Sequence, residues 1–262
     1  MEIKEVKPSA KLIAYTKTID NRGPEAVVAA AAKLCYSKTD ASTLLDNSTP
    51  EKDAAFIERL NSLGHESPYE HATFTFAIEG ISRACSHQLV RHRIASYSQQ
   101  SQRYVDLSDT FSVVVPDEIK NDSKAYVVFM ESIKKDIADY ITIKDELTKK
   151  YDEVNDAQSK ASLKKAIENA RYLLPNACET KVVMTMNARS LNNFFKERCC
   201  NRAQDEIRSL AYIMLDEVLD VAPDLFINSG APCIKGPCPE GKMTCGHPQK
   251  RLVKQIRSKN ER

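Results

Sequence analysis

Apolar side chains recur at every second position of segment 73–80, where Phe74, Phe76 and Ile78 alternate with other residues. A two-residue period of this kind predicts a β-strand with one buried face. The short segments 10–16, 111–116 and 181–187 predict three further strands.

Other parts of the chain carry apolar residues at the spacing of three to four positions that is typical of an amphipathic helix. This spacing predicts helices over 23–37, 48–64, 82–93 and 190–220, and two more within the charged stretch 117–170. In the second helix Ser48 and Glu51 match a capping box, and Gly64 is suited to end it.

Strands and helices follow one another without the regular order of βαβ units, which predicts an α+β fold. We expect one domain over 1–230, with a helical insertion at about 117–170, and a Cys-rich, basic tail over 231–262.

The chain has 262 residues, of which 38 are basic and 36 acidic, so its net charge is only +2. This balance argues against a general nucleic-acid-binding protein, which usually has a marked basic excess. No apolar run is long enough to span a membrane, and the first residues lack the apolar core of a signal peptide. We therefore expect a cytoplasmic protein whose eight cysteines are reduced, with no nucleic-acid or membrane partner.

Glycine is scarce, with seven in all, and neither G-x-G-x-x-G nor G-x-x-x-x-G-K-[ST] occurs. If the protein binds a nucleotide, side chains must hold the phosphates, because no glycine loop is present to do so. Arginine offers a planar fork of donors to an anion, and an amide pairs with a pyrimidine edge. Such groups gather in 88–103 and recur at Arg171, Asn187, Arg189, Asn193 and Arg198. Alternatively, 91–93 is a solvated basic face, the two asparagines are helix caps, and Arg189 and Arg198 are surface charges.

The stretch RHRIASYSQQSQRY places Arg91, His92 and Arg93 eight positions before Ser101 at the end of an R-H-R-x₇-S motif. This motif resembles that of the flavin-dependent thymidylate synthases. The blocks EHATFTF (70–76), QLVRHR (88–93), ARYLLP (170–175) and MNARSLNNFFKER (186–198) resemble further blocks of that family in the same order. The resemblance covers roughly residues 10–230.

The resemblance implies a central, mostly antiparallel sheet flanked by helices. It also implies reductive methylation of dUMP to dTMP, with 5,10-methylenetetrahydrofolate as carbon donor and NADPH as hydride source through FAD. The family assembles as a homotetramer with active sites at subunit interfaces, which implies the same for this chain.

The resemblance also implies roles for individual residues. Arg198 is the expected catalytic residue, because it would stabilise negative charge on the pyrimidine. The expected dUMP contacts are Gln88, Leu89, Val90, Arg91, Gln99, Gln100, Ser101, Gln102, Arg103, Arg171 and Arg198. The expected FAD contacts are His71, Thr73, Arg91, His92, Arg93, Gln99, Asn187, Arg189 and Asn193.

Some positions leave alternatives or depart from the family pattern. Ser101 is either a hydrogen-bond partner of the nucleotide, which we favour, or a nucleophile. Gln99 stands where some members carry an acid, Asp205 where an aromatic is frequent, and Cys35 where a serine is common.

The tail carries Cys233, Cys238, Cys245 and His247, a ligand set that would suit tetrahedral zinc. The spacings are not those of a typical zinc ribbon, so we expect reduced thiols in a tail lying over the body and no metal. Cys199 and Cys200 are expected to be buried small hydrophobes.

Three other functions remain open from the residues alone. One is a structural zinc module built on the tail, which would not explain the ordered Arg and Asn blocks. A single-strand nucleic-acid-binding protein would stack bases on Tyr97 and Tyr104. A flavin-free thymidylate synthase would need a cysteine nucleophile, for which Cys178 or Cys199 could be proposed.

Overall fold

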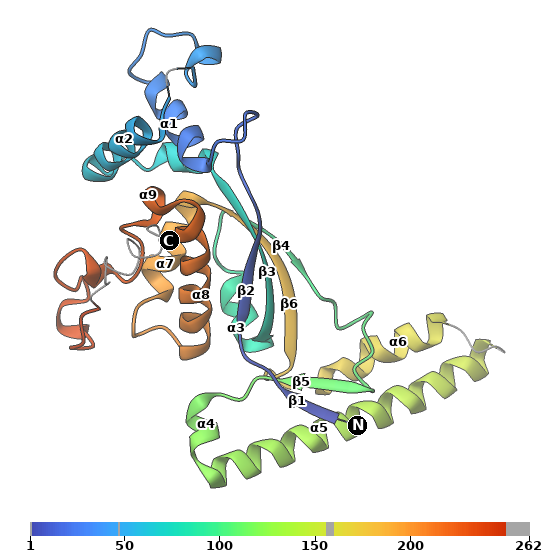
Figure 1. Cartoon of the computed structure of the whole chain (residues 1–262). Coiled ribbons are helices and arrows are strands. Elements are labelled where there is room, and N and C mark those ends of the chain that lie inside the picture. Colours follow the sequence, from blue (N-terminus) through green and yellow to red (C-terminus); the bar gives the residue numbers. More distant parts are fainter. Residues whose placement is uncertain (1, 47, 156–159, 250–262) are drawn as a thin grey trace. The chain divides into compact units, whose positions relative to one another are not determined.

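The computed structural model describes residues 2–46, 48–155 and 160–249, so the basic end of the predicted tail lies outside the described residues. Helices and strands are mixed along the chain, which confirms the α+β prediction (Figure 1). The strands are β1 Glu2–Glu5, β2 Ser9–Tyr15, β3 Thr73–Ser82, β4 Ala95–Gln99, β5 Thr110–Val113 and β6 Glu179–Asn187. The helices are α1 Pro24–Leu34, α2 Pro50–Leu63, α3 Arg83–Leu89, α4 Asp117–Asn121, α5 Ser123–Asn155, α6 Lys160–Ala170, α7 Ala188–Arg198, α8 Asp205–Val221 and α9 Pro223–Phe226.

Four strands form one sheet in the order β2-β3-β6-β4. Thr75 contacts Thr185, whereas Gly80 contacts Glu179, so β3 and β6 run in opposite directions. Strand β1, which the sequence pattern did not predict, pairs in parallel with β5. The predicted insertion is largely helical in its described part, but it forms three helices, α4, α5 and α6, where two were predicted, with a break at Asp122.

Three sequence predictions about helices are wrong in detail. The cap of α2 is Thr49, which accepts the Lys52 N–H, while Ser48 instead donates to Asp53. The predicted helix 82–93 ends at Leu89, so the R-H-R motif lies in a turn after it.

The predicted helix 190–220 is two helices, α7 and α8, separated by 199–204. Arg208 ties this turn by donating to the carbonyls of Asn201 (3.1 Å) and Ala203 (3.2 Å). The apolar residues of α7 and α8 keep a helical period across the turn, so the spacing alone could not reveal the break.

The chain divides into two compact units. Unit 1 comprises Met1–Pro8, Glu79–Gln88 and Ser98–Val182, and unit 2 comprises Ser9–Ile78, Leu89–Tyr97 and Val183–Arg262. The units interleave along the sequence, and strands β3 and β6 each contribute residues to both. The expectation of a single domain over 1–230 stays a prediction.

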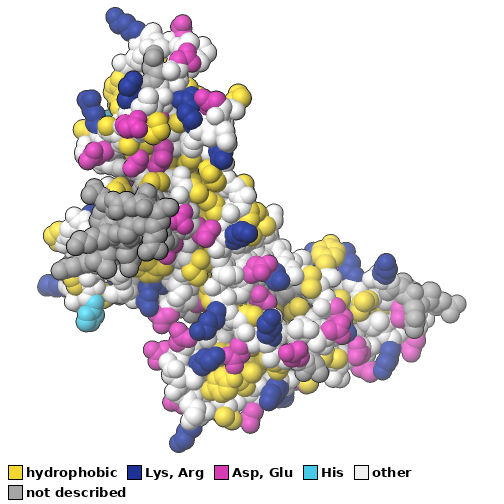
Figure 2. Space-filling view, in the orientation of Figure 1, with side chains coloured by type: hydrophobic (Ala, Val, Ile, Leu, Met, Phe, Trp, Pro, Cys, Tyr) yellow, Lys and Arg dark blue, Asp and Glu magenta, His cyan; other side chains and the backbone are white. Residues whose placement is uncertain are grey.

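Unit 1 has its own apolar core, in which α5 packs its inner face against β5 and the start of the chain. The buried residues of this core are Phe111, Val113, Val115, Ile133, Ile137 and Cys178. The outer surface of α5 carries basic and acidic side chains interspersed (Figure 2). This pattern is that of an amphipathic surface helix.

Unit 2 is built around α7 and α8, and Figure 1 shows α8 alongside β2. Glu217 of α8 accepts the backbone N–H of Leu12 at 2.8 Å, which fixes β2 to this helix. Four phenylalanines pack edge to face in its core: Phe74, Phe194, Phe195 and Phe226. Among the described helices, none is long and apolar enough to cross a membrane.

Gly80 offers a test of the packing in unit 1. Its φ is +67°, and a Cβ there would lie 2.0 Å from the Lys7 carbonyl oxygen. Gly80→Ala should therefore lower the free energy of unfolding by about 3 kcal/mol or more, because the backbone must move as well as adopt a strained φ. Gly64 has the same kind of φ, +68°, with open space around it. Gly64→Ala should cost only about 1–2 kcal/mol. If denaturant unfolding gave the same loss of unfolding free energy for both variants, the close approach of Gly80 to the Lys7 carbonyl would be contradicted.

Candidate active site

The R-H-R motif does not present three like charges to one place. Arg91 and Arg93 are exposed, while His92 between them is buried with 7% of its surface accessible. Burial favours the neutral imidazole, because an unpaired charge is costly away from water. The motif therefore separates two solvated guanidinium groups with an uncharged ring.

The buried ring of His92 is held by Arg198. The Nε of Arg198 donates to Nε2 of His92 at 2.9 Å. A guanidinium can only donate, so Nε2 must be the acceptor and the proton of the imidazole lies on Nδ1. That nitrogen lies 3.9 Å from a carboxylate oxygen of Glu197. Burial first, and then the charge of Arg198, lower the pKa of His92.

Aromatic packing fixes the position of the same ring. His92 meets Phe194 edge to face, with 4.9 Å between the ring centres. Phe194 continues the row of phenylalanines in the core of unit 2. The imidazole is thus held by packing as well as by hydrogen bonding, which restricts where Arg198 can point.

Arg198 lies in the last turn of α7, where a cation interacts favourably with the helix dipole. Its Nε is used by His92, and its two terminal NH₂ groups make no hydrogen bond to any residue within the described ranges. The side chain lines a pocket of about 430 Å³, the Arg198 pocket. Two donor groups of a side chain that lines this pocket are therefore left without a partner among the described residues.

A second pocket, of about 800 Å³, lies in the same unit and gathers four of the predicted FAD contacts. These are Arg93, Asn187, Arg189 and Asn193. Its volume is within the range of about 300–1,000 Å³ that is usual for ligand pockets. We call it the α7 pocket, because Asn187, Arg189, Asn193 and Lys196 reach it from the start and outer face of that helix.

The junction of β6 and α7 explains this arrangement. Asn187 ends the strand and caps the helix by accepting the Ser190 N–H at 2.8 Å. The alternative reading of Asn187 as a cap is therefore correct, and the same residue also lines the pocket. Leu191, Phe194 and Phe195 take the buried face of α7, which leaves Arg189, Asn193 and Lys196 on the exposed face.

The cations of the α7 pocket differ in how they are paired. Arg189 forms ion pairs with Glu70 (2.5 Å) and Glu66 (3.5 Å). Arg93, Lys196 and Lys235 have no ion pair among the residues that are described. An anion entering this pocket would meet three uncompensated cations and one that is already neutralised.

Besides His92, three predicted FAD residues of unit 2 do not line the α7 pocket. His71 and Arg91 are exposed, and Thr73 at the start of β3 contacts the Thr16 hydroxyl at 2.9 Å. Among the dUMP predictions, the side chain of Leu89 is fully buried. The Leu89 carbonyl and that of His92 both accept the Tyr97 hydroxyl, at 2.8 and 3.0 Å.

Most of the predicted dUMP residues lie in unit 1. They are Gln88, Gln99, Gln100, Ser101, Gln102, Arg103 and Arg171, of which five are consecutive in the sequence, at 99–103. Gln99 donates to the Thr180 hydroxyl at 3.1 Å, and Arg103 pairs with Glu168 at 2.5 Å. The Ser101 hydroxyl accepts the Arg103 N–H at 3.2 Å, which is a local turn contact.

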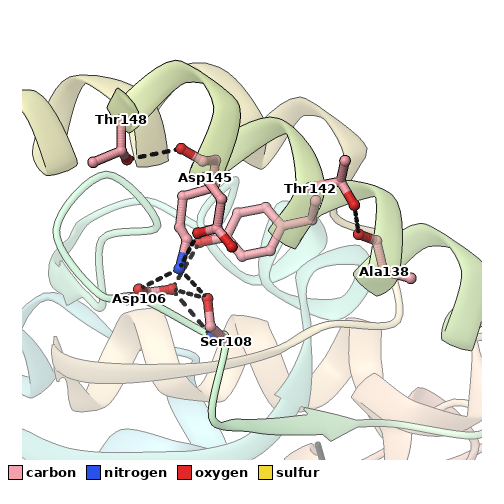
Figure 3. Close-up of polar contacts among 8 residues, drawn as sticks. Asp106, Ser108, Ala138, Thr142, Asp145 and Thr148 are labelled. Carbon is pink, nitrogen blue, oxygen red and sulfur yellow. Dashed lines mark hydrogen bonds and ion pairs between the residues drawn. The ribbon is translucent and has the colours of Figure 1, made fainter. Parts of the chain in front are cut away.

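The loop after 99–103 is fastened to α5 by a buried lysine. Lys144 is 7% exposed and donates to Asp106 (3.0 Å) and Ser108 (2.6 Å), and it also pairs with Asp145 at 3.3 Å. Figure 3 shows Asp106 and Ser108 on the loop beneath the helix that carries Asp145. The Tyr140 hydroxyl also donates to Asp106, at 3.3 Å. The predicted nucleotide loop is therefore positioned by the helical insertion.

The cysteines differ sharply in environment. Cys199 is fully buried, as predicted, but Cys200 is partly exposed and lines the Arg198 pocket, contrary to the prediction. Burial raises the pKa of the Cys178 thiol to about 11. In the described part of the chain, no group of three His, Cys, Asp or Glu residues is arranged to hold a metal ion.

Several residues of these sites were not found from the sequence. Glu66 and Lys235 in the α7 pocket lie outside the quoted blocks, while Glu70 and Lys196 lie within them but were given no role. Lys144 is one of many lysines in a charged helix, and its burial is visible only in the folded structure.

Comparison with known proteins identifies the family. The family described as "Thymidylate synthase complementing protein" matches residues 11–224. The chain belongs to this family. A curated relative named flavin-dependent thymidylate synthase, from Clostridium tetani, is 52% identical over 246 residues, which cover 94% of this chain and 96% of the relative. One of the same name from Geobacter sulfurreducens is 49% identical over 224 residues, which cover 85% of this chain and 89% of the relative. The resemblance inferred from the sequence blocks is confirmed.

A solved structure has a fold similar to that of this chain. It is a UMP/dUMP methylase from Streptomyces cacaoi bound with 5-Br dUMP, and it superposes with a TM-score of 0.69 at 19% identity. The match covers 88% of this chain and 98% of the other.

The environment of His92 predicts a pH dependence of stability. Because the folded pKa is lowered, the unfolded chain binds a proton first, and the contribution of neutral His92 is lost as the pH falls below about 6.5. His92→Gln keeps an acceptor for Arg198 but cannot titrate. As the pH is lowered from about 7 to about 5, the melting temperature of the wild type should decrease more than that of this variant. A difference that stays constant over this range would contradict a buried neutral His92. His87→Gln, on the exposed face of α3, serves as the control.

The contacts of Lys144 predict that it positions the nucleotide loop. Lys144→Met should lower the free energy of unfolding by about 1–3 kcal/mol, because Asp106 loses its charged donor. If the loop binds dUMP, as the family resemblance implies, Lys144→Met should also raise KM for dUMP more than it lowers kcat, since it acts through the loop and not on the reacting atoms. Lys149→Met removes an exposed lysine of the same helix, paired with Glu146 at 3.0 Å, and should leave both quantities unchanged. Equal kinetics in the two variants would contradict the role of Lys144.

Proposed function

We propose that this chain is a flavin-dependent thymidylate synthase that methylates dUMP to dTMP. The observation that carries the proposal is the hydrogen bond between Arg198 and a neutral, buried His92. This bond uses the Nε of Arg198 and leaves its two terminal NH₂ groups available in a side chain that lines a pocket. The α7 pocket in the same unit brings together four residues that the family resemblance assigns to FAD.

The α7 pocket suits a flavin nucleotide. Arg93, Lys196 and Lys235 would bind a diphosphate, and the amides of Asn187 and Asn193 would bind polar ring edges. FAD bound there would supply hydride transfer, which side chains cannot perform. NADPH as hydride source and 5,10-methylenetetrahydrofolate as carbon donor belong to the same proposal.

Arg198 is assigned the electrostatic step. Carbon 5 of the uracil ring attacks a one-carbon electrophile only when the ring is electron-rich, with negative charge on N3 and the ring oxygens before the attack. A guanidinium held by its Nε keeps its terminal donors aimed at that charge without reorganising. Gln99–Arg103 would bind the nucleotide, with Ser101 as a hydrogen-bond partner rather than a nucleophile.

The thiol alternatives fit the structure poorly. A cysteine nucleophile must become a thiolate, and burial raises the pKa of Cys178 to about 11. Cys199 has no exposed surface through which to reach a substrate. The flavin mechanism requires no enzyme nucleophile and is therefore preferred.

The nucleic-acid alternative has less support than the enzyme. The Tyr97 hydroxyl is used by two backbone carbonyls, and Lys164 lies 4.5 Å from the centre of the Tyr104 ring. A homotetramer in the cytoplasm, with active sites shared between subunits, completes the proposal by family resemblance.

The first experiment is an absorbance scan of the purified protein, followed by anaerobic addition of NADPH with and without dUMP. Oxidised-flavin bands that bleach faster with dUMP, and formation of dTMP when folate is added, would support the proposal. Absence of flavin after incubation with FAD would overturn it.

Variants of Arg198 test its role within the same assay. Arg198→Ala should reduce kcat by about 10²–10³-fold while flavin binding persists, because a transition-state donor is lost. Arg198→Lys should fall between, since lysine keeps the charge but not the fork. Cys199→Ala should retain turnover. Loss of activity in Cys199→Ala with an active Arg198→Ala would exclude the assigned mechanism.

A further inference from the structure

The segment Pro232–Gln249 lies beyond residues 11–224, the part matched to the family, yet it contributes to both pockets of unit 2. Pro232, Lys235 and Pro239 line the α7 pocket. Pro232 and Pro239 also line the Arg198 pocket, together with other residues of the segment: Cys233, Cys238, Glu240, Cys245, His247 and Gln249. The segment is therefore part of the wall of each pocket.

A compact set of hydrogen bonds holds the end of this segment on unit 2. The side-chain amide of Gln249 donates to Asn201 and accepts the Tyr212 hydroxyl at 2.6 Å. Asn201 in turn donates to the His247 carbonyl at 3.2 Å. The backbone N–H of Gln249 donates to the Cys233 thiol at 3.2 Å, which ties the two ends of the segment together.

The hydrogen bonds of Gln249 also extend to the backbone beside Arg198. The Tyr212 hydroxyl that contacts Gln249 also lies 2.9 Å from the carbonyl of Cys199, so its single proton is shared between these two acceptors. Cys199 directly follows Arg198 at the end of α7. One hydroxyl therefore fixes the tail and the backbone beside the proposed catalytic arginine.

The pocket between these parts suits a small anionic ligand. Lys196, Arg198, Arg202 and His247 line it, against Glu197 and Glu240. The terminal NH₂ groups of Arg198 lack partners among the described residues, so they are available to a ligand. The cysteines that line this pocket do not form, with other described residues, a group that could hold a metal ion.

We propose that the segment Pro232–Gln249 is a wall of the dUMP-binding site, held in place by Gln249, so that bound dUMP lies between Arg198 and the thiols of Cys238 and Cys245. This inference rests on the proposed function. Gln249 is then a positioning residue, and the site extends beyond the residues assigned from the family motifs.

Thiol labelling tests the wall directly in the full-length, FAD-loaded protein. N-ethylmaleimide is added with and without dUMP, and the modification of each cysteine is followed by peptide mass spectrometry. Cys238 and Cys245 should react several-fold more slowly with dUMP bound, whereas exposed Cys35 should react at an unchanged rate. Equal rates at Cys238 and Cys245 in a protein that forms dTMP would overturn the wall and leave the proposed function intact. A wild type that forms no dTMP would overturn both.

A substitution tests the positioning role separately. Gln249→Leu removes two side-chain hydrogen bonds and should raise KM for dUMP about tenfold, with a much smaller change in kcat. Lys242→Ala, an exposed change in the same segment that lines neither pocket, is the matched control. Equal KM values in the two variants would contradict the role of Gln249.

Discussion

The arrangement of the site depends on one hydrogen bond, from Nε of Arg198 to Nε2 of His92. Arginine stays protonated in proteins, so its partner must be an acceptor, and a buried imidazole can accept only when it is neutral. This requirement fixes the tautomer of His92 and removes one of three charges from the R-H-R motif. It also fixes the direction of the Arg198 fork, since the Nε end is used and the opposite end is left for a ligand.

The α7 pocket contains several cations, and only one of them is paired with carboxylates among the described residues. In the α7 pocket Arg189 is neutralised by Glu66 and Glu70, while Arg93, Lys196 and Lys235 are not paired among the described residues. Clustered guanidinium and ammonium groups repel one another, and the two carboxylates offset part of that repulsion. A phosphate that engages Arg189 must compete with Glu70, whereas one that engages Arg93 or Lys235 need not. A ligand phosphate should therefore gain more free energy from binding to the unpaired cations Arg93 and Lys235 than from binding to Arg189.

Local sequence signals predicted much of the fold, because a period of two or of three to four residues follows directly from backbone geometry. The alternation in 73–80 and the apolar stripe of α8 are of this kind. The break at 199–204 was missed because the helical period continues across it. Strand β1 was missed because Glu2–Glu5 has one apolar residue among charged ones, and β4 because Ala95–Gln99 is mostly polar. The motifs identified Arg198 and Asn187 as candidates, but no local signal could pair Arg189 with Glu70, which lies 119 positions away.

The motifs supply the reactive groups, and residues outside the motifs determine where those groups point. Lys144 in the helical insertion holds the loop that follows the glutamine-rich run, and Tyr212 and Gln249 hold the tail beside Arg198. These partners make contacts over long sequence separations, through groups that are chemically ordinary and therefore silent in a motif search. A donor aimed correctly before the substrate arrives needs no reorganisation at the moment of reaction, which is where electrostatic catalysis gains most. In the proposed mechanism, the residues that aim Arg198 are therefore as necessary to the site as the arginine itself.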